Sequence, residues 1–176
     1  MDRKRLRRTV LGAMFCALVY AATWISVPAP AVGNVNLGDG VLLLCAWMLG
    51  GVWAVFAAAL GAALADLTMG YAVYAPATFV IKALMVLAAI LIVHVLVKLR
   101  VPKWLSRVLS GVGAELVMLG GYFVYEAFIL QYGIAAAANI PFNAIQSAVG
   151  VSVACLCDAV LARAGISSEN DRGNLN

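Results

Sequence analysis

Three long apolar segments of this chain carry polar side chains at helical spacing. Each set lies on one face of a predicted helix: Tyr74, Thr78 and Lys82; Glu115, Tyr122 and Glu126; and Asn139, Asn143, Gln146 and Gly150. Polar faces of membrane helices turn away from lipid, so the three faces should meet. Carboxylate, amide, phenol and ammonium groups at one meeting point are suited to binding a small polar ligand.

The polar residues are concentrated in one half of the membrane. If the helix of Lys82 enters from outside, Lys82 lies about two turns below the outer surface. Glu126, Asn143 and Gln146 then lie at a similar depth, with Glu115 nearer the midplane. A channel would need polar residues along its whole length. The pattern therefore favours a pocket that opens to the outside.

Purely structural roles compete with ligand binding at several of these positions. Lys82 could pair with Asp66 or Glu115 as a buried ion pair that fixes helix packing. For Asp66 that pairing is favoured over ligand contact, whereas for Lys82 and Glu115 both roles stay open. Asn139 could serve only as a helix cap. The positions of Glu126, Asn143 and Gln146 favour ligand binding over a structural role.

Catalysis and metal binding are not expected. Glu115 and Glu126 are about 16 Å apart along a straight helix, too far to act on one atom. The chain contains no HExxH or GxSxG motif. Cys155 and Cys157 lack a second pair of ligands, because the only histidine is His94. No catalytic residue, metal site or cofactor is therefore assigned.

The composition indicates an integral membrane protein. Hydrophobic residues make up 65% of the 176 residues and charged residues 11%, whereas soluble domains are nearer half apolar and a quarter charged. Eleven of the twelve Lys and Arg lie in the first eight residues, in a loop at 98–107 and beyond residue 162. Topology explains this clustering, so the net charge of +4 is no sign of a nucleic-acid partner.

The segments predict an all-α integral membrane protein with one domain over residues 1–165. Its six helices cover 8–27, two crossings within 40–65 that turn at Gly50-Gly51, 75–97, 105–131 and 140–163. Two crossings in 40–65, the first of them short, put every basic cluster on the cytoplasmic side, together with the N- and C-termini. Residues 28–37, 69–74 and 132–139 then form outer loops, and 166–176 form a disordered polar tail.

Two helices carry strips of small residues that allow close helix approach. The first helix has Ala13, Ala17 and Ala21 four residues apart, and the third has a similar strip at 57, 61 and 65. Packing within the bundle is the default for the third helix. The strip on the first helix could equally face a partner protein.

Four stretches carry a resemblance to a known family: NVNLGDGVLLL, GAALADLTMGYAVYAPATFVIKALM, ELVMLGGYFVYE and NIPFNAIQSAVG. Over residues 8–163 the chain resembles the substrate-binding S component of energy-coupling factor (ECF) vitamin transporters. The likeness is greatest to the branch for riboflavin, hydroxymethylpyrimidine, pyridoxine and related precursors. It implies a six-helix S-component bundle in the cell membrane, with an outward pocket built from outer loops and helices 4 to 6.

The resemblance also implies partners. In this family an AxxxA motif on helix 1 docks against a membrane-embedded T subunit that two cytoplasmic ATPases drive. Ala13, Ala17 and Ala21 match that motif. The chain has no GxxxxGK[ST] phosphate loop, so it cannot power transport itself.

The expected substrate is a small heteroaromatic vitamin or precursor of the hydroxymethylpyrimidine or B6 type. The residues expected to bind it are Trp24, Asn36, Tyr74, Lys82, Glu115, Tyr122, Glu126, Asn139, Asn143 and Gln146. Acids near the pocket outnumber the one lysine, so either some acids are protonated or the ligand brings donors. Riboflavin, a queuosine or deazaguanine precursor, and a stand-alone small-solute carrier are the alternatives.

Overall fold

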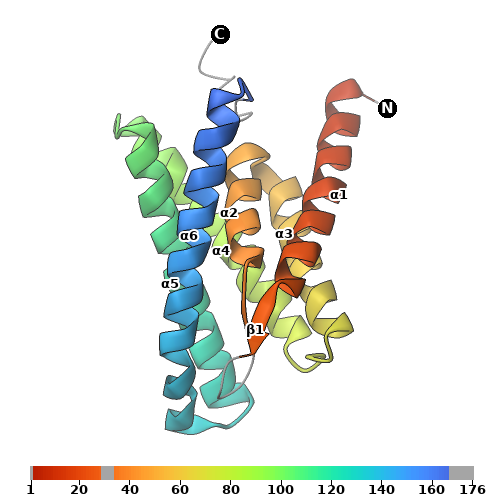
Figure 1. Cartoon of the computed structure of the whole chain (residues 1–176), viewed down its shortest axis with the longest axis vertical. Coiled ribbons are helices and arrows are strands. Elements are labelled where there is room, and N and C mark those ends of the chain that lie inside the picture. Colours follow the sequence, from red (N-terminus) through yellow and green to blue (C-terminus); the bar gives the residue numbers. More distant parts are fainter. Residues whose placement is uncertain (1, 29–33, 167–176) are drawn as a thin grey trace.

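The computed structural model describes residues 2–28 and 34–166, which form a bundle of helices (Figure 1). Six α-helices are present in this part of the chain: α1 (Arg3–Trp24), α2 (Gly38–Met48), α3 (Gly51–Thr68), α4 (Ala75–Lys98), α5 (Lys103–Val124) and α6 (Ile140–Arg163). Strands β1 (Ser26–Pro28) and β2 (Asn34–Asn36) pair antiparallel after α1. A π-helical turn η1 (Tyr125–Ile129) and a 3-10 helix η2 (Gly133–Asn139) join α5 to α6. The predicted tail beyond residue 166 lies outside the described residues.

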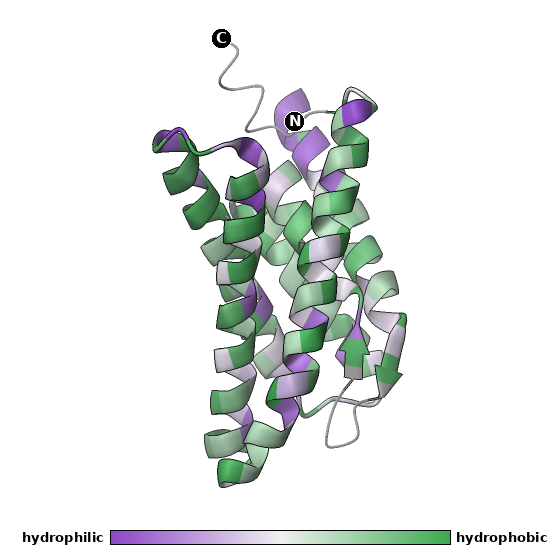
Figure 2. Cartoon of the chain, turned by 60° about the vertical axis from the view of Figure 1, so that its left-hand side comes forward, coloured by the Kyte–Doolittle hydropathy of each residue, from purple (hydrophilic) through white to green (hydrophobic). Residues whose placement is uncertain are grey.

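Five of the described helical segments are long and apolar enough to cross a membrane, and α2 is a shorter apolar helix. Figure 2 shows hydrophobic residues along the outward surfaces of the helices and hydrophilic residues gathered at the end that holds both termini. Large aliphatic side chains such as Leu18, Leu60 and Leu91 are exposed on these surfaces. Such side chains suit contact with lipid. The prediction of a six-helix membrane bundle is confirmed.

The turn at Gly50-Gly51 is also confirmed, and it makes α2 a short central helix. Both glycines have φ of 60°, a conformation that costs glycine little. Helix α2 is apolar on nearly all of its faces, and such helices are usually buried. Leu42, Leu43 and Trp47 are fully buried. The core of the bundle therefore lies around α2, which also carries Asp39 in its first turn.

Several element boundaries differ from the prediction. Helix α1 begins at Arg3 because the Asp2 side chain accepts a hydrogen bond from the Lys4 amide at 3.2 Å. It ends at Trp24, since the following residues pair with β2, so the region is not purely α-helical. The long fifth helix changes to a π-helical turn after Val124, and the predicted outer loop at 132–139 contains η2.

Arg107 does not belong to a basic loop as predicted, because it is buried within α5. Pro102 has an extended backbone and α5 starts directly after it. The Nε atom of Arg107 lies 3.6 Å from Asp158 Oδ2 on α6, and its guanidinium lies 5.2 Å from the centre of the Trp47 ring. The half of the bundle near the termini thus contains its own buried charged pair.

The two small-residue strips have different surroundings. On α3, Ala57, Gly61 and Ala65 are buried, and a Cβ atom added to Gly61 would collide with the Cys16 carbonyl oxygen of α1. Packing within the bundle is therefore confirmed for this strip. On α1 the residues that face α3 include Gly12 and Val19, whereas the alanine strip Ala13, Ala17 and Ala21 is exposed.

Candidate substrate-binding site

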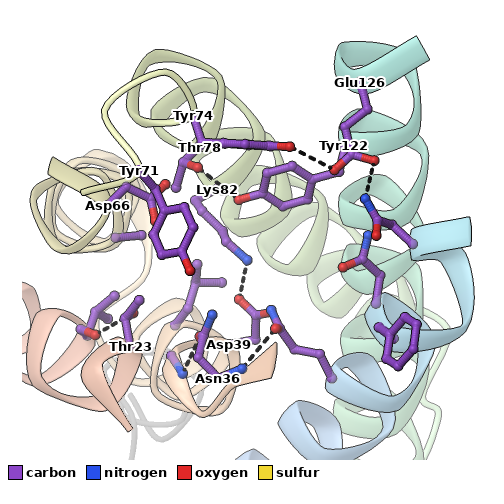
Figure 3. A pocket seen from close by; sticks show the side chains of 18 residues that line it. Thr23, Asn36, Asp39, Asp66, Tyr71, Tyr74, Thr78, Lys82, Tyr122 and Glu126 are labelled. Carbon is purple, nitrogen blue, oxygen red and sulfur yellow. Dashed lines mark hydrogen bonds and ion pairs between the residues drawn. The ribbon is translucent and has the colours of Figure 1, made fainter. Parts of the chain in front are cut away.

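A cavity opens in the half of the bundle away from the termini. It encloses about 710 Å³ when the open space at its mouth is included. The lining residues come from β2, η1, η2, all six α-helices and the segment between α3 and α4. Figure 3 shows their polar side chains pointing into the same space. The three predicted polar faces therefore do meet.

Eight of the ten residues expected to bind substrate line this cavity. They are Asn36, Tyr74, Lys82, Tyr122, Glu126, Asn139, Asn143 and Gln146. The remaining two, Trp24 and Glu115, do not line it, and each has a specific structural reason. The placement of the eight makes them candidates for contact with a ligand.

The deepest part of the cavity is a hydrogen-bonded network that we call the floor, made of Asp39, Lys82, Gln146 and Asn36. Lys82 is ion-paired with Asp39, whose side chain is fully buried. Gln146 Nε2 donates to Asp39 Oδ2 at 2.5 Å, and Gln146 Oε1 accepts from the Asn36 amide at 2.9 Å. The floor thus joins α2, α4, α6 and β2, as the dashed lines in Figure 3 show.

This pairing corrects the expectation that Lys82 pairs with Asp66 or Glu115. Asp39 begins α2 close to the N-terminus of that helix, where a carboxylate is favoured. Helix α2 is buried and carries Asp39 into the bundle. Asp66 lines the cavity on the opposite side from Glu126 (Figure 3) and is half-buried.

Two hydrogen-bond donors hold the Glu126 carboxylate in the cavity. The Tyr74 hydroxyl donates to its Oε1 at 3.4 Å, and Asn139 Nδ2 donates to its Oε2 at 2.9 Å. Asn139 precedes α6, but its side chain makes no capping hydrogen bond, which excludes the cap as its main role. Glu126 lies in the π-helical turn η1, and such turns often occur at functional sites.

Tyr74 remains a hydrogen-bond donor at neutral pH. Burial and the neighbouring Glu126 carboxylate raise the pKa of its hydroxyl. Its ring lies 6.5 Å from the ring of Tyr122, and the Tyr122 hydroxyl is 2.9 Å from the Thr78 hydroxyl. Lys82 Nζ is 5.6 Å from the centre of the Tyr122 ring. One side of the cavity is therefore an aromatic wall beside a fixed carboxylate.

Trp24 was expected to stack on the ligand, but the structure places it outside the cavity. Its side chain is 48% exposed and packs against Tyr20, with the ring centres 6.4 Å apart. Neighbouring residues of a helix point about 100° apart. The inward direction at this level belongs to Thr23, which lines the cavity. Thr23, one position before Trp24, therefore occupies the place in the lining that was expected for Trp24.

Glu115 was also expected at the site, but it lies below the floor. It is 3% exposed, and a Cβ atom added to Gly150 of α6 would lie 3.0 Å from both Glu115 Oε1 and Asp39 Cβ. Glu115 therefore approaches the floor from the terminal side. Its position deeper than Glu126 agrees with the prediction, but it does not line the cavity as expected.

The sequence interpretation missed other lining residues. Asp39, Thr23, Tyr71 and Phe142 all line the cavity. The available signal was the NVNLGDG stretch, which places an acid in the first turn of a helix that is otherwise uncharged. Among the described residues, no group of three His, Cys, Asp or Glu side chains is arranged to hold a metal ion.

The fold and the cavity define a multi-pass membrane protein with a cavity in one half of a helical bundle. A sequence model of the ECF-type riboflavin transporter S component family matches residues 3–163, and the chain belongs to this family. It is therefore a substrate-binding S component of an ECF-type transporter and not an enzyme, in agreement with the sequence analysis.

Two known proteins are similar to this chain over most of its length. The chain is 29% identical over 173 residues to the thiamine precursor transporter HmpT of Lactococcus lactis subsp. cremoris (strain MG1363), covering 94% of each protein. A solved S component of a bacterial ECF transporter shares the fold, with a TM-score of 0.69 and 24% identity over 90% of this chain and 97% of that one.

Proposed function

We propose that this S component binds a neutral pyrimidine-methanol precursor of thiamine in the cavity and delivers it through a T subunit and two ATPase subunits. The observation that carries the proposal is the Glu126 carboxylate, fixed by Tyr74 and Asn139 beside an aromatic wall. A carboxylate oxygen accepts more than one hydrogen bond. Glu126 can therefore still accept from an amino group of a ring that stacks on Tyr74 or Tyr122.

The charge of the cavity supports a neutral or amino-bearing substrate. Lys82 is the one cation among the described lining residues, and Asp39 neutralises it. Asp66 and Glu126 face the same space. A phosphate or carboxylate group would meet these acids without a cation to pair with, and that counts against an anionic substrate.

The remaining contacts suit a ring that carries several polar groups. Asn36, Asn139, Asn143 and Gln146 offer amides around the cavity, and Phe142 adds apolar surface. Riboflavin is the second candidate, because the matching family is described by that vitamin. The thiamine-precursor proposal is preferred because the relative that covers nearly the whole chain is a thiamine precursor transporter.

The alanine strip of α1 supports docking to a T subunit. Ala13, Ala17 and Ala21 are exposed and do not pack within the bundle. Small residues let another helix approach closely in lipid. The strip lies on one face of a helix that begins at the basic N-terminus, which we place in the cytoplasm together with the C-terminus. The start of α1 and the end of α6 lie at the same end of the bundle (Figure 1).

Uptake into proteoliposomes tests this function. Labelled hydroxymethylpyrimidine should enter only when the T subunit, the ATPases and ATP are present with the wild-type chain. Ala17→Leu should slow this uptake about tenfold, because the larger side chain keeps the partner helix away. Binding of the substrate to the purified variant should stay unchanged, since Ala17 is exposed and does not line the cavity.

Leu18→Ala is the matched control, because Leu18 is also exposed on α1 but lies outside the strip. This variant should keep uptake near the wild-type rate. Uptake by the wild-type chain alone would contradict the proposal and indicate a stand-alone carrier. Equal uptake by Ala17→Leu and wild type would remove the alanine strip from the docking surface.

A further inference from the structure

Glu115 is a buried acid that the ligand cavity does not use. Its side chain lies in α5 below the floor and is 3% exposed. By distance and angle, neither carboxylate oxygen has a hydrogen-bond partner among the described residues. The neighbouring Ser147 hydroxyl of α6 donates to the Asn143 carbonyl oxygen instead. An ionised carboxylate without donors costs several kcal/mol inside a membrane. Every other acid with a described place at the cavity either has a donor or faces the open space, so Glu115 stands apart.

Among the described residues, the cation near Glu115 is already paired with another acid. Asp39 of α2 faces the same glycine of α6, Lys82 of α4 is bound to Asp39, and Tyr122 is the titratable neighbour on α5 itself. The facing part of α6 contributes the uncharged Gln146 and Gly150. The cluster therefore contains one ammonium group, on Lys82, and two carboxyl groups, on Asp39 and Glu115.

More distant charges do not change this balance. Glu126 is about 16 Å away along α5, and Asp66 lines the cavity above the floor. Arg107 lies two turns from Glu115 toward the termini, where its partner is Asp158. A negative charge on Glu115 would therefore be buried and would have to share the Lys82 ammonium with Asp39.

We infer that Glu115 is a proton-binding site: its carboxyl group stays protonated at neutral pH, and this proton keeps the buried cluster of Asp39, Lys82 and Glu115 electrically neutral. Neutrality does not then depend on a charged substrate, so the cluster has no net charge whether the cavity is empty or filled. The inference rests on burial, missing donors and the charge count, independently of which substrate binds.

The proton links stability to pH. In the unfolded chain a glutamate is ionised at neutral pH, so folding requires Glu115 to take up a proton. The native state then binds more protons than the unfolded state, and stability falls as the pH rises. Glu115→Gln has a neutral side chain of the same shape and needs no proton. The variant should therefore melt above the wild type at pH 7, and the difference should widen from about pH 5 to about pH 8.

Asp158→Asn provides the matched control, because Asp158 is an acid paired with Arg107. Its loss should lower the melting temperature by an amount that stays constant over the same pH range. If Glu115→Gln behaved in this way, with a constant loss at every pH, Glu115 would be ionised and the inference would be wrong.

Infrared spectroscopy of the protein in detergent supplies a second test that does not depend on the glutamine variant folding. The wild type at pH 7 should show the C=O stretch of a protonated carboxylic acid, and Glu115→Asp should shift that band. A wild-type spectrum without the band, or a band unchanged in Glu115→Asp, would overturn the assignment.

Discussion

Glu126→Gln should weaken substrate binding by about 30- to 100-fold, equivalent to about 2–3 kcal/mol. Tyr74 and Asn139 donate to the two oxygens of Glu126. An amide in place of the carboxylate turns one acceptor into a donor, so a donor group then faces Asn139 or Tyr74. The same change removes the negative charge that would attract an amino group of the ligand. Isothermal titration of purified wild type and variant with hydroxymethylpyrimidine measures the effect.

Two variants serve as controls for this change. Glu115→Gln makes the same chemical substitution on the same helix, below the floor, and should leave the dissociation constant within about threefold of wild type. Tyr74→Phe removes one donor to Glu126 and keeps the ring, so its loss should be near tenfold. A dissociation constant for Glu126→Gln within about twofold of wild type would show that Glu126 does not contact the substrate.

Asp39→Ala should be the most destabilising single substitution at the site, by about 3–5 kcal/mol. Asp39 is fully buried and accepts from both Lys82 and Gln146. Its removal leaves a buried ammonium without a counter-charge and a buried amide without its acceptor. Substrate binding should be lost as well, because the floor holds α2, α4 and α6 together. Chemical unfolding in detergent, followed by tryptophan fluorescence, measures the change.

The double variant Asp39→Ala/Lys82→Met separates charge from packing. Replacing both members of a buried ion pair costs less than removing one of them. The double variant should therefore recover a large part of the stability lost in Asp39→Ala. Asp66→Ala is the control, since Asp66 is half-buried at the cavity and should cost about 1 kcal/mol or less. If the double variant were no more stable than Asp39→Ala, the ion pair would not explain the loss.

Local signals predicted the helices well. Pro141 at the start of α6 and the run of apolar residues after it set the start of a helix that was predicted with the same limits, Ile140–Arg163. The short α2 was inferred from the positions of basic residues rather than from hydropathy. The first inference depends on residues within one segment. The second depends on the positions of the basic residues along the chain, which can be read directly from the sequence.

Contacts between segments were less predictable. The pairing of Lys82 with Asp39 depends on how deep α2 sits against α4, and no periodicity within either helix encodes that depth. Glu115 of α5 and Glu126 of η1 were predicted on one helical face, but the packing of Asp39, Lys82 and Gln146 decides which of the two lines the cavity. The direction of Trp24 was missed because one residue at a helix end changes the facing direction by about 100°.

Titration of the purified, ligand-free protein with hydroxymethylpyrimidine, its phosphate ester and riboflavin tests the central claim most directly. Thermal stability and tryptophan fluorescence would be read together, because a ligand at a hundred times its dissociation constant stabilises the native state by about 2.7 kcal/mol. We expect tight binding of hydroxymethylpyrimidine and at least about a hundredfold weaker binding of the phosphate ester, because Asp39 already neutralises Lys82. Tight binding of riboflavin or of the phosphate ester, with no response to hydroxymethylpyrimidine, would contradict the proposed substrate.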